Sequence, residues 1–279
     1  MESESPTGSG ELKRKADSEP AAAAAPPPDS PAADAEVTFP VVDVPWRGVT
    51  PRRVDRLANG SYLVCSQGSV VAFRGCAIVN AANRGCLGGG GVDGAISSAG
   101  GDALADARHA LPVLRRGVRC ETGDAVVTCA GGALRCDHVF HAVGPDYYDY
   151  ETDAEADALL ARAYDAVMAH AARLRVRTLA CSLLSAAIYR AHRPLAVVLR
   201  IAVDALRRGA YDGLEEAHLV GFTPAELRTL VQVASEAAGE AGQGDAPEAP
   251  HAAPQAAQET PPAPVDAPAA DEAAPSTAS

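Results

Sequence analysis

A short apolar run at residues 77–79 leads directly into two asparagines, Asn80 and Asn83, and then into four consecutive glycines at residues 88–91. The segment that starts at Val92 has helical character. Glycines let backbone N–H groups approach a ligand closely, and the N-terminus of a helix attracts anions. A strand, an amide-rich loop, a glycine run and a helix start therefore predict a site for a phosphorylated ligand.

Strand-like and helix-like segments alternate along the middle of the chain. The predicted strands are residues 62–65, 77–79, 125–129, 138–142, 178–181 and 218–222. The predicted helices are residues 92–109 with a break at 100–101, 153–174, 195–206 ending at Gly209, and 225–236 after Thr223 as N-cap and Pro224. This alternation implies a three-layer α/β/α domain, with its ligand site at the carboxyl ends of the strands.

Composition divides the chain into three parts. Residues 1–45 and 239–279 are rich in alanine and proline, and residues 239–279 have almost no large apolar side chains, so both segments are predicted to be disordered tails. Residues 46–238 form the one predicted domain. The whole chain has a formal charge of −12, but residues 46–235 hold 21 arginines, no lysine and 19 acidic residues, a net of +2. A near-neutral domain argues against a nucleic-acid partner.

The cysteines indicate a reducing environment. There are seven, an odd number, and no Cys-x-x-Cys pair occurs among them. This usage is typical of an intracellular protein, cytoplasmic or nuclear, and the missing ligand spacing argues against zinc. No apolar run approaches the roughly 20 residues of a membrane span.

Four motifs resemble those of the macro domain family, the ADP-ribose-binding modules, and they occur in the family's order. They are residues 80–83 with 89–96, residues 121–128, residues 138–145 and residues 184–189. The resemblance covers roughly residues 46–238. It implies a macro domain with a central mixed sheet between the two disordered tails, and it implies neither a cofactor nor a metal.

The resemblance also implies roles for individual residues. Asn83 is expected to hold the distal ribose, and Asp93 to orient a water or a ribose hydroxyl, which makes these two the predicted catalytic residues. Without the resemblance, an asparagine in a turn and an aspartate in a first helical turn need no ligand. The predicted ligand-binding residues are Asn80, Gly89, Gly90, Gly91, Val92, Ser69, Val70, Ser185, Ala186, Ala187, Ile188, Tyr189 and Phe222.

Three of these residues have more than one interpretation. Asn80 is expected mainly to brace the first loop. Tyr189 is expected either to pack against the distal ribose or simply to join a loop to a helix. Phe222 is expected either to flank the adenine or to pack in the core.

The chain departs from the family's pattern at four positions. Ser69 occupies the place of the aspartate that contacts adenine, and Ser97 occupies the place of a histidine in the helix after Asp93. Ala187 and Arg190 replace glycines in the second loop, where added side chains narrow the backbone's approach to phosphate. Arg190 is also able to contact the anionic oxygens of a ligand.

The leading hypothesis is an enzyme that binds ADP-ribose and hydrolyses mono-ADP-ribose from modified proteins, at ester linkages to acidic side chains, or from related ADP-ribose conjugates. One alternative is a module that binds ADP-ribose without turnover, and another is an interaction scaffold whose pocket has decayed. The expected partner is ADP-ribose or a mono-ADP-ribosylated protein, and the protein is expected to be a monomer that needs no metal and contacts no membrane.

The glycine run also fits a different fold. The spacing of glycines at positions 89, 91 and 94 satisfies the dinucleotide-binding fingerprint. That fingerprint requires a second strand ending in an acidic residue about twenty residues further on, and no such strand is predicted. The phosphate cradle is therefore preferred to the dinucleotide fold.

Overall fold

The computed structural model describes residues 44–243, so the predicted tails lie almost entirely outside the described residues. Seven strands form one sheet in the order β1-β2-β7-β6-β3-β5-β4. They are β1 (Thr50–Arg56), β2 (Tyr62–Gln67), β3 (Ala77–Ala81), β4 (Asp124–Cys129), β5 (His138–Val143), β6 (Thr178–Ser182) and β7 (Glu216–Gly221). The five inner strands are parallel and the two edge strands are antiparallel to their neighbours.

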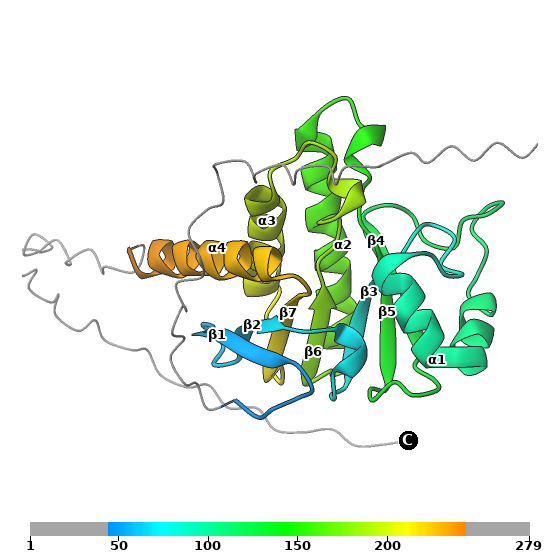
Figure 1. The fold of residues 1–279 in the computed structure, drawn as a ribbon, viewed down its shortest axis with the longest axis horizontal. Helices are drawn as coiled ribbons and strands as arrows, with labels where there is room; N and C mark the ends of the chain where they lie inside the picture. The colour runs from blue at the N-terminus through cyan, green and yellow to red at the C-terminus, as the bar shows by residue number, and fades with distance from the viewer. Residues whose placement is uncertain (1–43, 244–279) are drawn as a thin grey trace, which may run out of the picture.

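Helices cover both faces of this sheet (Figure 1). They are α1 (Gly91–His109), α2 (Asp153–Arg173), α3 (Leu195–Arg208) and α4 (Pro224–Gln243). One apolar cluster joins α2, α3 and α4 to one face, and a second joins α1 and the 3-10 helix Val70–Ala72 to the other. All five residues of β6 are buried, as expected for a parallel strand that is covered on both faces. The predicted three-layer domain with a mixed sheet is confirmed.

Helix ends follow the signals in the sequence. The Thr223 hydroxyl accepts a hydrogen bond from the Glu226 N–H at 3.2 Å, and the Glu226 carboxylate accepts one from the Thr223 N–H at 2.8 Å. This reciprocal pair is a capping box, and it confirms the predicted start of α4. Gly209 caps α3 as expected. The break expected in α1 is also present, because Gly101 has φ 57° and ψ −155°.

One strand was missed, and one helix extends well beyond its predicted end. No strand was predicted before residue 62, yet β1 pairs with β2 along the edge of the sheet. Its sequence, Thr-Pro-Arg-Arg-Val-Asp-Arg, lacks the alternation of apolar residues that marks a half-buried strand. Helix α4 reaches Gln243, seven residues beyond its predicted end. Within residues 44–243, no helix is both long enough and apolar enough to cross a membrane.

Candidate functional site

A cavity of about 420 Å³ opens where the carboxyl ends of β2, β3, β6 and β7 meet. This volume suits a small-molecule ligand. The predicted residues that line it are Ser69, Val70, Gly91, Val92, Ala186, Ala187 and Phe222. The predicted residues that lie outside its wall are Asn80, Asn83, Gly89, Gly90, Asp93, Ser185, Ile188 and Tyr189. The two predicted loops thus meet at one cavity, while the polar residues of the first loop lie behind its surface.

The first loop is closed by the side chain of Asn83. Its Nδ2 donates to the Gly88 carbonyl at 2.8 Å, and its Oδ1 accepts from the Gly85 N–H at 3.0 Å. Cys86, between them, has a positive φ of 55°, which is uncommon for a residue with a side chain. The amide of Asn83 therefore holds the loop in shape, and it retains one N–H and one lone pair for a ligand.

Side chains pack closely around Gly89. A Cβ there would lie 3.1 Å from Asp93 Oδ2 and 3.3 Å from Asn83 Nδ2. Gly91 instead has φ 58° and open space around it. The N-cap of α1, Gly90, supplies no side chain, so the first N–H groups of the helix are free to bind an anion.

Asp93 lies in the first turn of α1, and only 3% of its surface is exposed. Its Oδ1 accepts from Asn80 Nδ2 at 2.9 Å and from Arg108 Nη2 at 2.7 Å. Its Oδ2 has no hydrogen-bond partner and faces Gly89. One carboxylate oxygen is thus engaged by the protein, and the other is left as an acceptor behind the glycine run.

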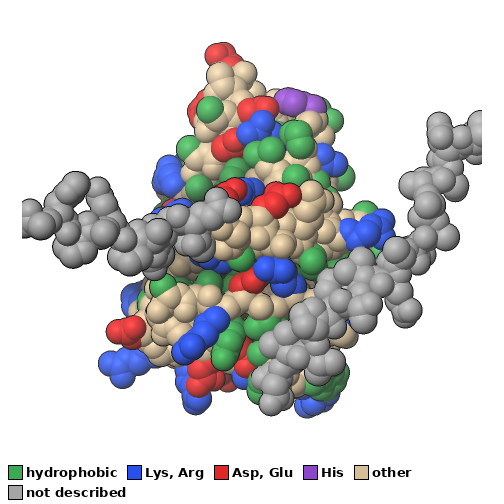
Figure 2. Space-filling view, turned by 90° about the vertical axis from the view of Figure 1, so that its left-hand side faces the viewer, with side chains coloured by type: hydrophobic (Ala, Val, Ile, Leu, Met, Phe, Trp, Pro, Cys, Tyr) green, Lys and Arg blue, Asp and Glu red, His purple; other side chains and the backbone are tan. Residues whose placement is uncertain are grey.

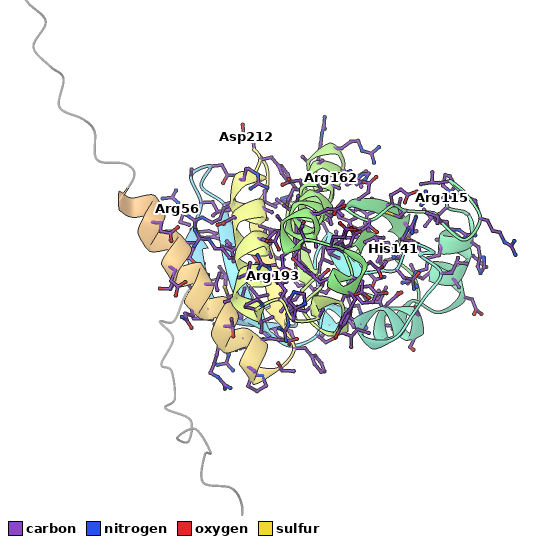
Figure 3. All side chains as sticks on the ribbon, turned by 90° about the horizontal axis from the view of Figure 1, so that it is seen from above. Arg56, Arg115, His141, Arg162, Arg193 and Asp212 are labelled. Carbon is purple, nitrogen blue, oxygen red and sulfur yellow. The ribbon has the colours of Figure 1, made fainter. Side chains whose placement is uncertain are left out.

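A chain of polar side chains continues from Asp93 into the sheet. Asn80 Nδ2 lies 3.2 Å from His141 Nδ1, and His141 Nε2 lies 2.9 Å from Thr128 Oγ1. Because the Asn80 amide donates, Nδ1 of His141 accepts and Nε2 carries the proton. Burial, with the nearby charge of Arg108, lowers the pKa of His141 to about 3. His141 lies inside the molecule (Figure 3) and is neutral there.

The second loop follows β6. The Ser185 hydroxyl donates to the Pro145 carbonyl at 2.7 Å, so this side chain faces the protein. Ser185 has φ 51°, which turns the chain so that Ala186 and Ala187 reach the cavity. Ile188 is 82% exposed. Arg190 donates to the Ala186 carbonyl at 3.3 Å and so contacts its own loop.

A two-aspartate clamp holds the far end of this loop. Arg193 forms ion pairs with Asp153 and Asp157, both in the first part of α2. Tyr147 also donates to Asp157, at 2.7 Å. These contacts fix the end of the second loop to α2, so its conformation does not depend on its exposed residues.

The opposite end of the cavity lies between the 3-10 helix and α4. The Ser69 hydroxyl accepts from the Val71 N–H at 3.3 Å and caps the 3-10 helix. Phe222 is 74% exposed and borders the cavity, so the alternative of core packing was wrong. Glu226 also lines the cavity and accepts from the Phe222 N–H at 3.0 Å.

Sequence reasoning missed Arg108, His141 and Glu226, and it also missed five other residues that line the cavity: Gly68, Ala95, Ser182, Leu183 and Val220. Arg108 follows Asp93 by fifteen positions in one helix, a separation that ordinarily places two side chains far apart. Glu226 carried a recognisable capping signal, but nothing in its pattern placed it at a cavity. Among the described residues, no group of three or more His, Cys, Asp or Glu side chains is placed to hold a metal ion.

Comparisons with known proteins find relatives of this chain. The Macro domain family model matches residues 79–202. A macro domain-containing protein of Cupriavidus necator is 39% identical over 170 residues, which cover 61% of this chain and 95% of that protein. The O-acetyl-ADP-ribose deacetylase 1 of Pantoea vagans is 40% identical over 158 residues, which cover 56% of this chain and 88% of that protein.

Solved structures show the same fold. The Oceanobacillus iheyensis macrodomain with ADP superposes with a TM-score of 0.61 at 23% identity, covering 67% of this chain and 97% of that one. The Trypanosoma brucei macrodomain in complex with ADP-ribose gives a TM-score of 0.52 at 28% identity, covering 61% and 68% of the two chains.

Proposed function

This chain belongs to the macro domain family, and we propose that it binds ADP-ribose and hydrolyses the ester that joins mono-ADP-ribose to acidic side chains. One observation carries this proposal. The partner-free Oδ2 of the buried Asp93 lies against Gly89, two residues before Gly91, which lines a cavity of about 420 Å³. A binding cavity and a fixed acceptor thus lie side by side.

Each part of the ligand has a suitable partner in the cavity. The diphosphate fits the start of α1, where the N–H groups near Gly91 and Val92 have no side-chain cap. The second loop lines the same space at Ala186 and Ala187. The adenine fits against the exposed ring of Phe222.

The reaction needs a water placed at the distal ribose. In the proposed step, the oxygen of water forms a bond to C1″ as the bond from C1″ to the ester oxygen breaks. The products are ADP-ribose, a free carboxylate and one proton, which passes to solvent. Asp93 Oδ2 accepts a hydrogen bond from the water or from a ribose hydroxyl, and the spare N–H of Asn83 holds the ribose. Fixing these groups in advance removes part of the entropic cost of reaching the transition state.

Smaller esters are candidate substrates for the same site. The relative from Pantoea vagans is named for deacetylating O-acetyl-ADP-ribose, which is also an ester of ADP-ribose. The cavity wall ends at the exposed residue Ala187, so the group beyond the distal ribose reaches solvent. We propose that the enzyme accepts both a protein side chain and an acetyl group at that position.

The test is release of label from a protein mono-ADP-ribosylated on glutamate. We expect the wild-type protein to release the label, and Asn83→Ala and Asp93→Ala to slow the release by about 10- to 100-fold, the loss typical of one misplaced polar contact. Full retention of label by folded wild-type protein would contradict hydrolysis.

A second candidate function is a reader that binds ADP-ribose without turnover. The burial of Asp93 and its ion pair with Arg108 favour it, because a carboxylate engaged this way contributes to shape whether or not a reaction follows. Calorimetry with ADP-ribose separates the two candidates. Binding without label release supports the reader, and binding with release supports the enzyme.

A further inference from the structure

Arg108 reaches Asp93 only because α1 is broken. The two residues are fifteen positions apart, and in a straight helix that separation spans about 22 Å along the axis. Here Arg108 Nη2 lies 2.7 Å from Asp93 Oδ1. The non-helical backbone at Gly101 turns the second half of α1 back, and Figure 1 shows the helix as two segments at an angle.

The pairing is almost fully enclosed. The side chains of Arg108 and Asp93 are 2% and 4% exposed. Arg108 Nη1 donates to Ser97 Oγ at 2.8 Å, and Ser97 Oγ donates to the backbone carbonyl of Asp93 at 2.7 Å. The serine thus leaves room for the guanidinium and links it to the backbone of Asp93. A larger side chain at position 97 would displace the arginine.

The arrangement makes the two oxygens of Asp93 unequal. Oδ1 accepts from both Arg108 and Asn80, which fixes the plane of the carboxylate. Oδ2 is then directed to the glycine run without a partner in the protein. Arg108 also lies under that run, because a Cβ on Gly88 would be 3.6 Å from Arg108 Nη1. A buried carboxylate without this cation would be strongly destabilised and free to reorient.

We propose that Arg108 is a positioning residue for the reaction: it acts through Asp93, holding Oδ2 as the acceptor for the reacting water or ribose hydroxyl. The inference rests on the proposed function. Arg108 follows the break in α1, and it contacts neither the ligand cavity nor the substrate.

The test is a double-mutant cycle on the full chain. The variants are Asp93→Asn, Arg108→Met and the double variant, measured by kcat and KM for label release and by the Kd for ADP-ribose. We expect Arg108→Met to lower kcat about 10- to 100-fold and to leave KM and Kd within about threefold, because the ribose and phosphate contacts persist. The double variant should be no slower than Asp93→Asn alone, within about threefold.

Two further variants sharpen the test. Arg108→Lys keeps the charge but loses the planar fork that contacts Asp93 and Ser97 together, so its kcat should lie between those of wild type and Arg108→Met. Arg116→Met removes an exposed arginine from the loop after α1 and should leave kcat within about twofold of wild type.

The outcomes are distinct. A double variant whose loss is the product of the two single losses would show that Arg108 acts independently of Asp93 and would overturn the proposal. If a single variant does not fold, Arg108→Lys decides: a lowered kcat with unchanged Kd supports the role, and an unchanged kcat overturns it. Wild-type protein that binds ADP-ribose without turnover contradicts the proposed hydrolysis itself, whereas normal turnover with an additive cycle contradicts only the role of Arg108.

Discussion

The side chains around Asp93 form one hydrogen-bonded network. Asn80, Arg108 and Ser97 are joined by hydrogen bonds between 2.7 and 2.9 Å, and Gly89 closes the remaining side. In such a network each side chain limits the orientation of the next, so small changes in one are felt at the others. We therefore expect substitutions at closely packed residues of this network to lower activity, even where the residue touches no ligand.

Gly89→Ala tests this packing. The new Cβ would lie 3.1 Å from Asp93 Oδ2, tighter than an ordinary contact, so the carboxylate or the Asn83 amide must move. We expect kcat for label release to fall by about tenfold while the protein stays folded. The matched control is Gly239→Ala, where a Cβ meets nothing within 4 Å. Equal activity of the two variants would contradict the expected crowding.

The buried histidines predict acid sensitivity of folding. Burial lowers the pKa of His141 to about 3, and burial also lowers the pKa of His218. The unfolded chain binds these protons near the ordinary value of about 6.5, so the folded state binds fewer protons below that pH and loses stability as pH falls. We expect urea unfolding to give a free energy that falls below about pH 6.5 by up to about 1.4 kcal/mol per pH unit and per histidine.

Glu216 is expected to extend the loss of folding stability to lower pH. Burial alone would raise its pKa, but hydrogen bonds from His218 and Arg47 outweigh burial and lower the pKa to about 2. A carboxyl with a lowered pKa contributes stability above its ordinary value and loses it as pH falls toward 2. Stability that stays constant from pH 7 to pH 4 would contradict the neutral, buried state of both histidines.

At the scale of elements, the sequence predicted the features that depend on contacts between neighbouring residues of the chain. The N-cap at Thr223 and the break in α1 were visible because they involve neighbours along the chain. The pairing of β1 was not, since an edge strand rich in arginine is held by backbone hydrogen bonds to β2. The contact of Arg108 with Asp93 was also not predictable from the sequence, because it depends on the direction in which the helix turns at Gly101.

Gly101→Ala tests the helix break. Its φ of 57° and ψ of −155° fall in a region that is almost exclusive to glycine, although no atom lies within 4 Å of the added Cβ. We expect backbone strain to lower the free energy of unfolding by about 1–3 kcal/mol and kcat to fall as Arg108 shifts. Asp102→Ala, exposed at the same break, is the control. Wild-type stability and turnover in Gly101→Ala would show that the break does not depend on glycine.

At the scale of the molecule, strand order creates the site. β3 and β6 are adjacent and parallel although about a hundred residues separate them, so the loops that follow them face each other across one cavity. Sequence motifs predicted both loops, but which residues point inward depends on this pairing. Figure 2 shows arginines and acidic residues interspersed on the face formed by β1 and α4, in agreement with the near-neutral charge of the domain. An anion would therefore be attracted by nearby backbone N–H groups rather than by a charged surface.

The most direct measurement is a calorimetric titration of the full chain with ADP-ribose, repeated on Ala187→Trp. Ala187 is exposed and lines the cavity, so an indole there fills the space between the loops without disturbing the core. We expect saturable one-to-one binding by the wild-type protein and at least a tenfold loss of affinity in the variant, about 1.4 kcal/mol or more. No binding by folded wild-type protein, or equal affinity in the two proteins, would contradict a ligand held between the two loops.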